Sequence, residues 1–409
     1  MVAGGDPGLL DPRQEGCEPP RMEFALTPEQ QAIRDGVAAL CARFDAAYWL
    51  ERDRAGGFPE EFHRAVAEAG YLGICIPEEY GGSGLGITEA TLMMEAIAAS
   101  GAGMSGATAV HLNIFGLNPV AVFGTEAQKR RMLPPIARGE VKACFGVTEP
   151  TTGLDTTRLK TRAERCGDRY IVNGQKVWIS TAQVADTILL LARTTPIEQC
   201  RSPAEGLSLF YTRLDRARAS VREIEKMGRK AVDSNEIFFA DMEVPEEDRI
   251  GEEGKGFRYI LHGLNPERVL IAAEAVGIGR AALARAADYA RERVVFGRPI
   301  GQNQAVQHPL AQDWMALEAA WLMCLNAAWR YDRGLECGAQ ANAAKYLAGE
   351  AGLKACQNAV MTHGGFGYAR EYHVERFLRE AMIPWIAPVS PNLICCYIAE
   401  RVLGLPKSY

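Results

Sequence analysis

The stretch that decides the fold is Tyr170-Ile171-Val172-Asn173-Gly174-Gln175-Lys176-Val177-Trp178-Ile179, because it indicates β structure in the middle of an otherwise helical chain. The short apolar runs on either side of Asn173-Gly174 predict a β-hairpin, since Asn-Gly is the strongest short turn signal. Three more runs are predicted to be strands: Ile188 to Leu191, Leu207 to Tyr211 and Glu236 to Phe239. This spacing predicts a small antiparallel barrel or sandwich.

The residues on both sides of this region are predicted to be helical. The segment Thr27-Pro28-Glu29-Gln30 begins a helix, with threonine as N-cap, proline in the first turn and glutamine placed for a capping box. From Phe257 to about Arg293 the chain is Ala-rich and amphipathic, interrupted only by Pro266, and such a pattern predicts a helical bundle. The expected fold is therefore mainly α with a central β domain: an N-terminal helical domain (23–140), a β domain (141–245) and a C-terminal bundle (246–409).

Bulk composition limits the classes of function. A chain of 409 residues is too long for one hydrophobic core, so two or three domains are expected. The formal net charge of −6 argues against a nucleic-acid partner. Eleven cysteines without a Cys-x-x-Cys pair indicate reduced thiols and a cytoplasmic location, and six histidines scattered along the chain give no metal-binding pattern.

Neither a targeting segment nor a membrane span is predicted. Residues 1–22 contain Gly, Pro and acidic residues without the apolar core of a signal peptide, so we expect a disordered extension. No uninterrupted run approaches the roughly 18 apolar residues that cross a bilayer, so a soluble protein without a membrane partner is expected.

Chemical signals begin in the β region. Phe145-Gly146-Val147-Thr148-Glu149-Pro150 is followed by Gly153-Leu154-Asp155 and by Trp178-Ile179-Ser180. A flavin ring needs a flat apolar face, backbone donors at its pyrimidine edge and a hydroxyl near its reactive nitrogen, and this segment could supply each of them. Alone, a tryptophan such as Trp178 in a hairpin is more often a core residue than a cofactor platform, and Thr148-Glu149-Pro150 is equally explained as a turn followed by a cap.

Together, and preceded by Lys142-Ala143-Cys144, these motifs resemble the flavin segment of the acyl-CoA dehydrogenases, and the resemblance extends over roughly residues 24–405. It implies an N-terminal helical domain, a small antiparallel β-barrel, a C-terminal helical bundle, and FAD as cofactor. It also implies a flavin contact for six residues: Phe145, Val147, Thr148 and Gly153 along the ring edge, with Trp178 and Ser180 on the other side of the ring.

A second set of motifs matches the family segment that reaches the FAD of a neighbouring subunit. The resemblance implies that Arg293 pairs with the pyrophosphate, because a guanidinium fork holds two oxygens at once, and that Phe296 packs by the adenine. From the residues alone, Arg293 is a solvated cation at a helix end. The other implied FAD contacts are Asn303, Gln304, Gly364, Gly365, Ser390 and Asn392. A homotetramer or dimer with shared FAD follows from this resemblance.

Glu267 is the candidate catalytic base. It interrupts a helical stripe of Ile260, Leu264, Ile271 and Ile278, where burial should raise its pKa toward neutrality. A buried ion pair, or a cap after a break at Pro266, explains the same pattern without catalysis. In most family members the base lies in a C-terminal Glu-Gly-Thr loop, but a smaller group, including isovaleryl-CoA and long-chain acyl-CoA dehydrogenases, carries it where Glu267 stands.

The resemblance implies α,β-dehydrogenation of an acyl-CoA thioester. Glu267 would remove the α-proton, the β-hydrogen would leave as hydride to flavin N5, and the product would be a trans-2-enoyl-CoA whose electrons pass to an electron-transfer flavoprotein. The implied substrate contacts are Leu154, Leu264, Arg268 and Pro388.

Three residues depart from the family pattern. Leu154 replaces a flavin-contacting serine, Met361 replaces a glutamine that helps to hold FAD, and Pro388 has no backbone N–H to donate to the thioester oxygen. Either Val389 or Ala387 supplies that donor, or the enolate loses a contact. An oxidase or monooxygenase on the same fold, and a non-catalytic flavin-binding homologue, are therefore the alternatives.

One dinucleotide-binding pattern is set aside. Gly277-Ile278-Gly279-Arg280-Ala281-Ala282 has the spacing of a Rossmann fingerprint but lies inside a helical run with no strand before it. Close packing between helices is the better interpretation.

Overall fold

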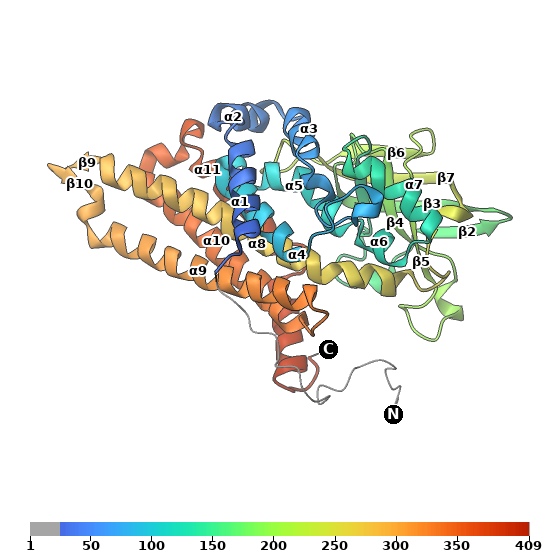
Figure 1. Ribbon diagram of the computed structural model, residues 1–409. Coiled ribbons are helices and arrows are strands. Elements are labelled where there is room, and N and C mark those ends of the chain that lie inside the picture. Colours follow the sequence, from blue (N-terminus) through green and yellow to red (C-terminus); the bar gives the residue numbers. More distant parts are fainter. Residues whose placement is uncertain (1–24, 409) are drawn as a thin grey trace.

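The structure is a computed structural model, and it describes residues 25–408. The predicted disordered extension, residues 1–22, lies outside the described residues. The chain forms a helical N-terminal part, a central sheet and a set of long C-terminal helices (Figure 1). The predicted fold class, mainly α with a central β region, is confirmed.

The N-terminal helices begin with the predicted capping box. Thr27 Oγ1 accepts a hydrogen bond from the Gln30 N–H at 3.2 Å, and Gln30 Oε1 accepts one from the Thr27 N–H at 3.1 Å. The helices are α1 (Pro28–Cys41), α2 (Ala46–Ala55), α3 (Glu60–Glu68), α4 (Ile87–Ile97), α5 (Gly103–Phe115), α6 (Asn118–Phe123) and α7 (Glu126–Ala137).

The central sheet has eight strands: β1 (Ala143–Gly146), β2 (Arg162–Cys166), β3 (Arg169–Ser180), β4 (Thr187–Arg193), β5 (Leu207–Arg213), β6 (Ala219–Glu223), β7 (Ser234–Pro245) and β8 (Arg249–Ile250). Their order is β6-β7-β3-β2-β4-β5-β8, and β1 pairs with β4. Most pairs are antiparallel as predicted, but β4 runs parallel to both β1 and β2. The three further predicted strands lie within β4, β5 and β7.

The predicted hairpin turn at Asn173-Gly174 is wrong. Both residues lie inside β3, at a shift in its register with β7, while the chain turns between β2 and β3 at Gly167, whose φ is 62°. Gly174 has a φ of 147°, and a Cβ there would lie 2.6 Å from the Thr161 Cα. Glycine at this position allows the β-bulge and the close approach of Thr161. An Asn-Gly dipeptide is compatible with a bulge as well as with a turn.

The C-terminal helices are long and pack on one another. They are α8 (Gly256–Glu292), α9 (Gln304–Asp332), α10 (Gly338–His363), α11 (Val374–Ile386) and α12 (Pro391–Tyr397), and a hairpin of β9 (Val294–Val295) and β10 (Arg298–Pro299) joins α8 to α9. The predicted interruption at Pro266 is wrong, because α8 continues through it. The long packed helix tolerates the loss of one backbone donor.

The glycines of the set-aside dinucleotide pattern lie in α8, where they allow close packing as predicted. A Cβ on Gly277 would lie 2.4 Å from the Glu95 carbonyl oxygen, and one on Gly279 would lie 3.0 Å from the Gly352 Cα. Only glycine permits α4 and α10 to approach α8 so closely.

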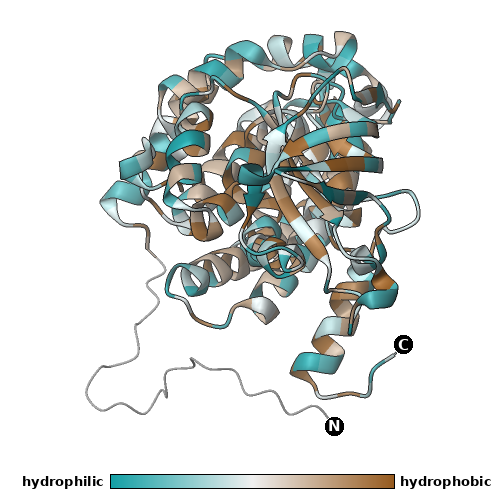
Figure 2. Cartoon of the chain, turned by 90° about the vertical axis from the view of Figure 1, so that its right-hand side faces the viewer, coloured by the Kyte–Doolittle hydropathy of each residue, from teal (hydrophilic) through white to brown (hydrophobic). Residues whose placement is uncertain are grey.

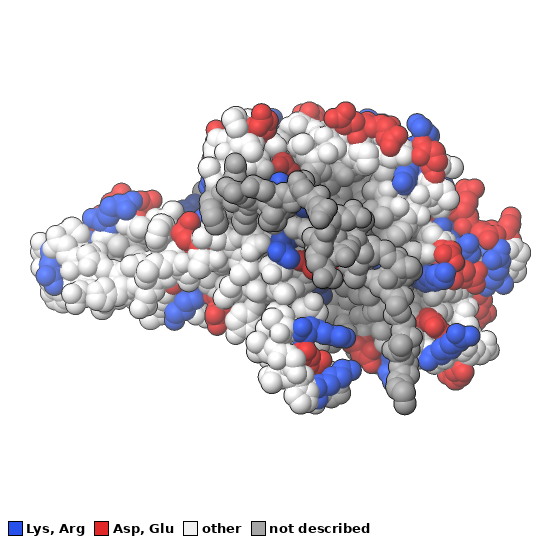
Figure 3. Space-filling view, turned by 60° about the horizontal axis from the view of Figure 1, so that its bottom comes forward, with Lys and Arg blue, Asp and Glu red and all other residues white. Residues whose placement is uncertain are grey.

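Coloured by hydropathy, the strands of the sheet and the inner helices contain many apolar residues, and the outer helices contain many polar ones (Figure 2). On the face in Figure 3, acidic and basic side chains are interspersed. Two helical stretches are nevertheless long and apolar enough to cross a membrane by length and composition, Ile87–Phe123 and Val374–Val402. The apolar window of the first is 72% buried, which identifies a core segment, whereas that of the second is only 17% buried.

Candidate active site

Helix α8 places Glu267 on the predicted apolar stripe. Ile260, Ile271 and Ile278 on this face are buried, and Leu264 is partly buried. Glu267 itself is partly exposed in the single chain, yet protein atoms surround it closely enough for burial to raise its pKa to about 7. The predicted shift toward neutrality therefore occurs.

Neither structural alternative for Glu267 is formed. The helix does not break at Pro266, so there is no cap at this point. The Arg268 guanidinium donates to Asn265 Oδ1 at 3.0 Å and to the Leu264 carbonyl oxygen, and Glu267 forms no ion pair within the described part of the chain. His111 and Arg268 lower the pKa of Glu267 through their charge, but desolvation by burial is the larger effect.

A second buried carboxylate, Glu274, lies two helical turns from Glu267 on the same face of α8. Glu274 is fully buried, and its Oε1 is hydrogen-bonded to Nδ1 of His111 on α5. Burial alone would lower the pKa of His111, but the carboxylate of Glu274 raises it above its ordinary value. This pair was not predicted: the seven-residue spacing from Glu267 could have indicated Glu274, but nothing in the sequence indicated His111 as its partner.

The predicted flavin segment is held by a buried ion pair. Lys176 Nζ donates to the Val147 carbonyl oxygen at 3.0 Å and to Glu149 Oε1 at 2.9 Å, and the Val177 N–H donates to the Thr148 carbonyl oxygen at 2.9 Å. Val147 and Thr148 are thus tied to β3, next to Phe145 of β1.

Glu149 is a structural anchor of this segment. It also accepts hydrogen bonds from the backbone N–H groups of Lys160 and Thr161, at 2.6 and 2.9 Å. Burial would raise its pKa, but Lys176 and these donors hold the pKa below the ordinary value. The turn of the simpler interpretation is present, since the Thr152 N–H donates to the Glu149 carbonyl oxygen at 3.1 Å, but Glu149 caps no helix: the next helical turn begins at Thr156 and has no side-chain cap. The Glu149 carboxylate instead supports the segment that the resemblance assigns to the flavin.

Trp178 and Ser180, at the end of β3, are accessible from outside the core. Trp178 has a left-handed backbone, with φ of 62°, and is 59% exposed, so it is not the core residue of the simpler interpretation. Ser180 Oγ accepts a hydrogen bond from Arg229 Nη2 at 3.2 Å. Arg229 was missed, because only the fold brings the loop before β7 to the end of β3. The loop residues Gly153 and Leu154 are exposed, and a Cβ on Gly153 would meet open space.

The second predicted cofactor group includes the β9–β10 hairpin, which lies at the opposite end of the molecule from the sheet (Figure 1). Phe296, at the tip of the β9–β10 hairpin, is 100% exposed. The Arg293 guanidinium lies 5.6 Å from the ring centre of Phe366, in the turn that contains Gly364 and Gly365. The structure therefore brings Arg293 close to the turn that contains these glycines. Trp178 and Ser180, at the end of β3, are not part of this group.

Other residues of this group have local roles. Asn303 Oδ1 accepts from Arg298 Nη2 at 2.7 Å, and Asn303 Nδ2 donates to the Ile300 carbonyl oxygen at 3.0 Å. Gln304, the first residue of α9, is exposed. Met361, one of the departures from the family pattern, is also exposed, near the end of α10.

The C-terminal loop around Pro388 is fixed by Lys345. This buried lysine donates to the carbonyl oxygens of Trp385 and Val389, at 2.8 and 2.7 Å. The Ala387 N–H is already bonded to the Ile383 carbonyl oxygen at 2.9 Å, whereas the Val389 N–H has no acceptor in the described part of the chain.

The two predicted FAD contacts that follow this loop differ in their surroundings. Ser390 Oγ accepts from the Leu393 N–H at 3.3 Å and so caps α12. Asn392, in the first turn of α12, is exposed.

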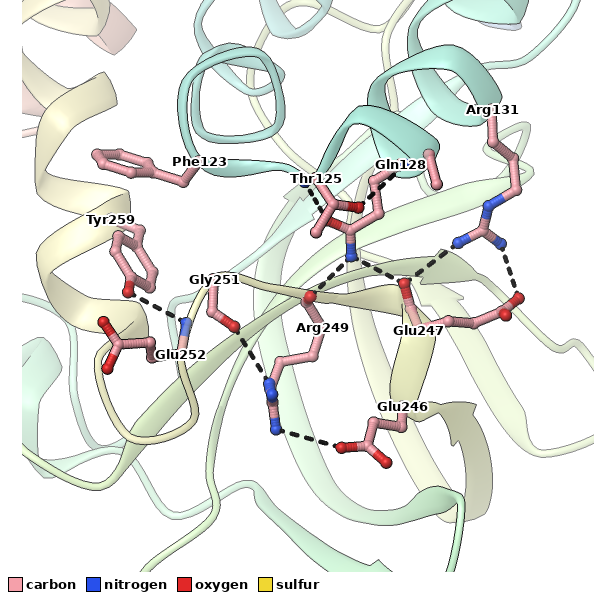
Figure 4. Close-up of a pocket in the computed structure, with 11 residues that line it drawn as sticks. Phe123, Thr125, Gln128, Arg131, Glu246, Glu247, Arg249, Gly251, Glu252 and Tyr259 are labelled. Atoms are coloured by element: carbon pink, nitrogen blue, oxygen red, sulfur yellow. Dashed lines mark hydrogen bonds and ion pairs between the residues drawn. The ribbon is translucent and has the colours of Figure 1, made fainter.

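A pocket of about 590 Å³ lies elsewhere, between α7, β8 and the start of α8 (Figure 4). Gln128 Nε2 bridges the carbonyl oxygens of Glu247 and Arg249 at 2.8 Å, and Arg131 pairs with Asp248 beside it. Its lining residues, all in the described part, include no predicted site residue. We interpret it as a polar joint between the N-terminal helices and the sheet.

Comparison with known proteins identifies the class. Sequence models of the acyl-CoA dehydrogenase N-terminal, middle and C-terminal domains match residues 27–140, 144–242 and 254–403. The chain therefore belongs to the acyl-CoA dehydrogenase family, a family of oxidoreductases and flavoproteins whose cofactor is FAD.

Individual relatives agree with this assignment. The acyl-CoA dehydrogenase FadE12 of Mycobacterium tuberculosis is 37% identical over 391 residues, which cover 94% of this chain and 99% of FadE12. A structure of glutaryl-coenzyme A dehydrogenase with glutaryl-CoA matches with a TM-score of 0.89 at 33% identity, covering 95% of this chain and 98% of the other. An FAD complex of PigA matches with a TM-score of 0.88 at 26% identity, covering 94% and 100%.

Proposed function

We propose that the chain dehydrogenates an acyl-CoA thioester between its α and β carbons, giving a trans-2-enoyl-CoA, with Glu267 as the base. The observation that carries this proposal is a carboxylate without an ion-pair partner on α8, with its pKa raised to about 7. A general base works best when its pKa lies near the operating pH.

Aromatic contacts link His111 to the flavin segment. The charge of His111 acts on Glu267, the His111 ring packs 4.7 Å from the Phe115 ring, and Phe115 packs 5.2 Å from Phe145. Helix α5 is thus the wall between the base and β1. A thioester lying along this wall would present its α-proton to Glu267.

FAD, when bound, supplies the acceptor for the β-hydride. The exposed ring of Trp178, the hydroxyl of Ser180 and the open space at Gly153 fit a flat cofactor ring at the end of β3. Arg229 supports this site by donating to Ser180 and to Thr108 Oγ1, at 3.2 and 3.3 Å.

The Val389 N–H is our candidate for the donor that Pro388 lacks. Of the two neighbouring N–H groups, that of Ala387 closes the end of α11, and that of Val389 is free for a thioester oxygen in the described structure. Lys345 holds the carbonyl groups on both sides of Pro388, which keeps this donor in one orientation. A fixed donor of this kind stabilises the oxygen charge that develops in the enolate.

We also propose a homotetramer or dimer in which two chains build each FAD site. The β9–β10 hairpin, which carries the exposed Phe296, and strand β3, whose end carries Trp178, lie at opposite ends of the molecule (Figure 1), so we propose that they serve flavins of different subunits. The largely unburied apolar stretch Val374–Val402 offers a surface for another subunit. An electron-transfer flavoprotein is the proposed acceptor of the electrons.

Anaerobic flavin reduction tests the function. Purified protein should be yellow, and a panel of acyl-CoA thioesters should bleach it. Glu267→Gln should keep its FAD but lose bleaching by at least about a thousandfold, whereas Glu164→Gln, at an exposed strand position, should bleach like the unaltered protein. Full reduction of Glu267→Gln would eliminate Glu267 as the base.

Pro388 gives reason to test an oxidase as the second candidate. If the loop does not stabilise the enolate as in a dehydrogenase, the reduced protein could react with oxygen instead. Reoxidation by air within seconds, with hydrogen peroxide formed in proportion to substrate, would favour the oxidase. Slow reoxidation by air, with rapid reoxidation by an electron-transfer flavoprotein, would favour the dehydrogenase.

A further inference from the structure

Helix α5 presents one open face beside the proposed base. Thr108, His111, Leu112 and Phe115 have the spacing of a single helical stripe. Most of α5 is buried, but Thr108 and Leu112, which flank His111, are partly exposed. An acyl group whose thioester lies at Glu267 would pass along this stripe.

Two charged side chains contact the polar residues of this stripe: Glu274 is hydrogen-bonded to His111, and Arg229 donates to Thr108. The Glu274 side chain is fully buried, and only its Oε1 is satisfied, by His111, while its Oε2 has no hydrogen-bond partner in the described chain. The Arg229 guanidinium donates to the hydroxyl oxygens of Thr108, Ser180 and Ser234 through its Nη atoms, and its buried Nε has no partner in the described chain either.

The charges of these groups act on one another. The charge of His111 acts on both Glu267 and Glu274, and Glu274 in turn stabilises the Arg229 cation. Asp233 and Glu380 are the other acidic groups that act on Arg229. Two buried polar atoms, one an acceptor and one a donor, thus remain available within one cluster. Leaving such atoms unsatisfied is costly, so a ligand atom that bonds them gains affinity.

We propose that the substrate is an acyl-CoA whose acyl chain carries a hydroxyl group, bound by Glu274 and Arg229. A hydroxyl can donate a hydrogen bond, which Glu274 Oε2 lacks, and can accept one, which Arg229 Nε lacks. A carboxylate could only accept, and it would face the Glu274 charge. A methyl group would leave both atoms unpaired. This inference rests on the proposed function for the position of the thioester.

Along α8, Glu274 lies about 10 Å beyond Glu267, since seven residues rise 1.5 Å each. The hydroxyl is therefore expected several carbons beyond the reacting bond. Suitable probes are ω-hydroxyacyl-CoA thioesters of four to eight carbons, each compared with the unsubstituted and the ω-carboxyl thioester of the same length.

Binding and turnover are measured separately, so that the inference and the proposed function can fail independently. Calorimetric titration of Glu267→Gln, loaded with FAD, reports affinity without turnover. At one chain length the hydroxyacyl-CoA should bind at least about tenfold more tightly than both comparators, as one hydrogen bond to a charged group predicts. Anaerobic bleaching of the unaltered protein reports the dehydrogenase activity.

The double substitution His111→Leu with Glu274→Leu is the matched test, because it removes both partners of the pair and leaves no lone buried charge. It should keep FAD and lose the hydroxyl preference. If it fails to fold, Glu274→Gln provides a milder change, which should reduce that preference. Equal affinity for all three thioesters at every length, or an unchanged preference in a folded double variant, would overturn the inference and leave the pair a structural contact between α5 and α8.

Discussion

The raised pKa of Glu267 predicts that replacing it with glutamine stabilises the protein above neutral pH. The Glu267 carboxyl group binds its proton more tightly in the folded protein than in the unfolded chain, since burial raises its pKa from 4.5 to about 7. The ionised carboxylate therefore destabilises the fold. That destabilisation is absent below about pH 4.5, grows between the two pKa values, and is complete above about pH 7.

The full rise corresponds to about 3 kcal/mol, and to about 2–3 kcal/mol once the partial exposure of the side chain is considered. Glutamine has nearly the same shape and carries no charge. Glu267→Gln should therefore exceed the unaltered protein by less than about 1 kcal/mol at pH 5 and by about 2–3 kcal/mol at pH 8.

Urea unfolding at equal protein and FAD concentrations, at pH 5, 6, 7 and 8, measures this difference. Glu164→Gln is the control, because its exposed side chain should give a small difference at every pH. The rate of flavin reduction in the unaltered protein should rise through pH 7 over the same range. A difference in stability that does not change with pH, or a flat rate profile between pH 6 and 8, would refute the assignment of a buried, tunable base.

Three further substitutions probe the surroundings. Arg229→Met should make the flavin potential more negative and slow its reduction about tenfold, because it removes a cation beside Ser180; a potentiometric titration with unchanged values would contradict this. Arg293→Ala should lower the FAD content per chain and the mass in solution, seen by absorbance and light scattering, and unchanged values would disprove a shared site. Lys345→Met should cost about 1–3 kcal/mol in urea unfolding and weaken thioester binding, since two loop carbonyl groups lose their donor; an unaltered dissociation constant would remove Val389 from the site.

Helix caps, strands and buried helix faces were predicted correctly where the pattern within one segment has a single structural explanation. The capping box at Thr27, the strands β4, β5 and β7 and the apolar stripe around Glu267 each follow from spacing within one element, whereas β1, β2, β6 and β8 were not predicted. The prediction of a turn at Asn173-Gly174 was wrong because glycine is compatible with a bulge and a close approach as well as with a turn. Only the position of Thr161 in the fold distinguishes the bulge from the turn.

The missing parts of the site depend on residues far apart in sequence. His111 and Glu274 are 163 positions apart, and Arg229 and Ser180 are 49 apart. Each side chain has an ordinary local context, so no periodicity within one element indicates its partner. The docking of α5 on α8, and of the loop before β7 on β3, brings them together.

The distance between Trp178 and Phe296 has a consequence for how the protein would behave on dilution. If each flavin is bound by the sheet of one chain and the hairpin tip of another, dissociation of a subunit from the oligomer also releases FAD. Colour would then fade as the protein is diluted, and added FAD would restore both colour and assembly, because a ligand that binds only the associated form draws subunits together by mass action. Cells short of flavin would accordingly accumulate separated, colourless chains.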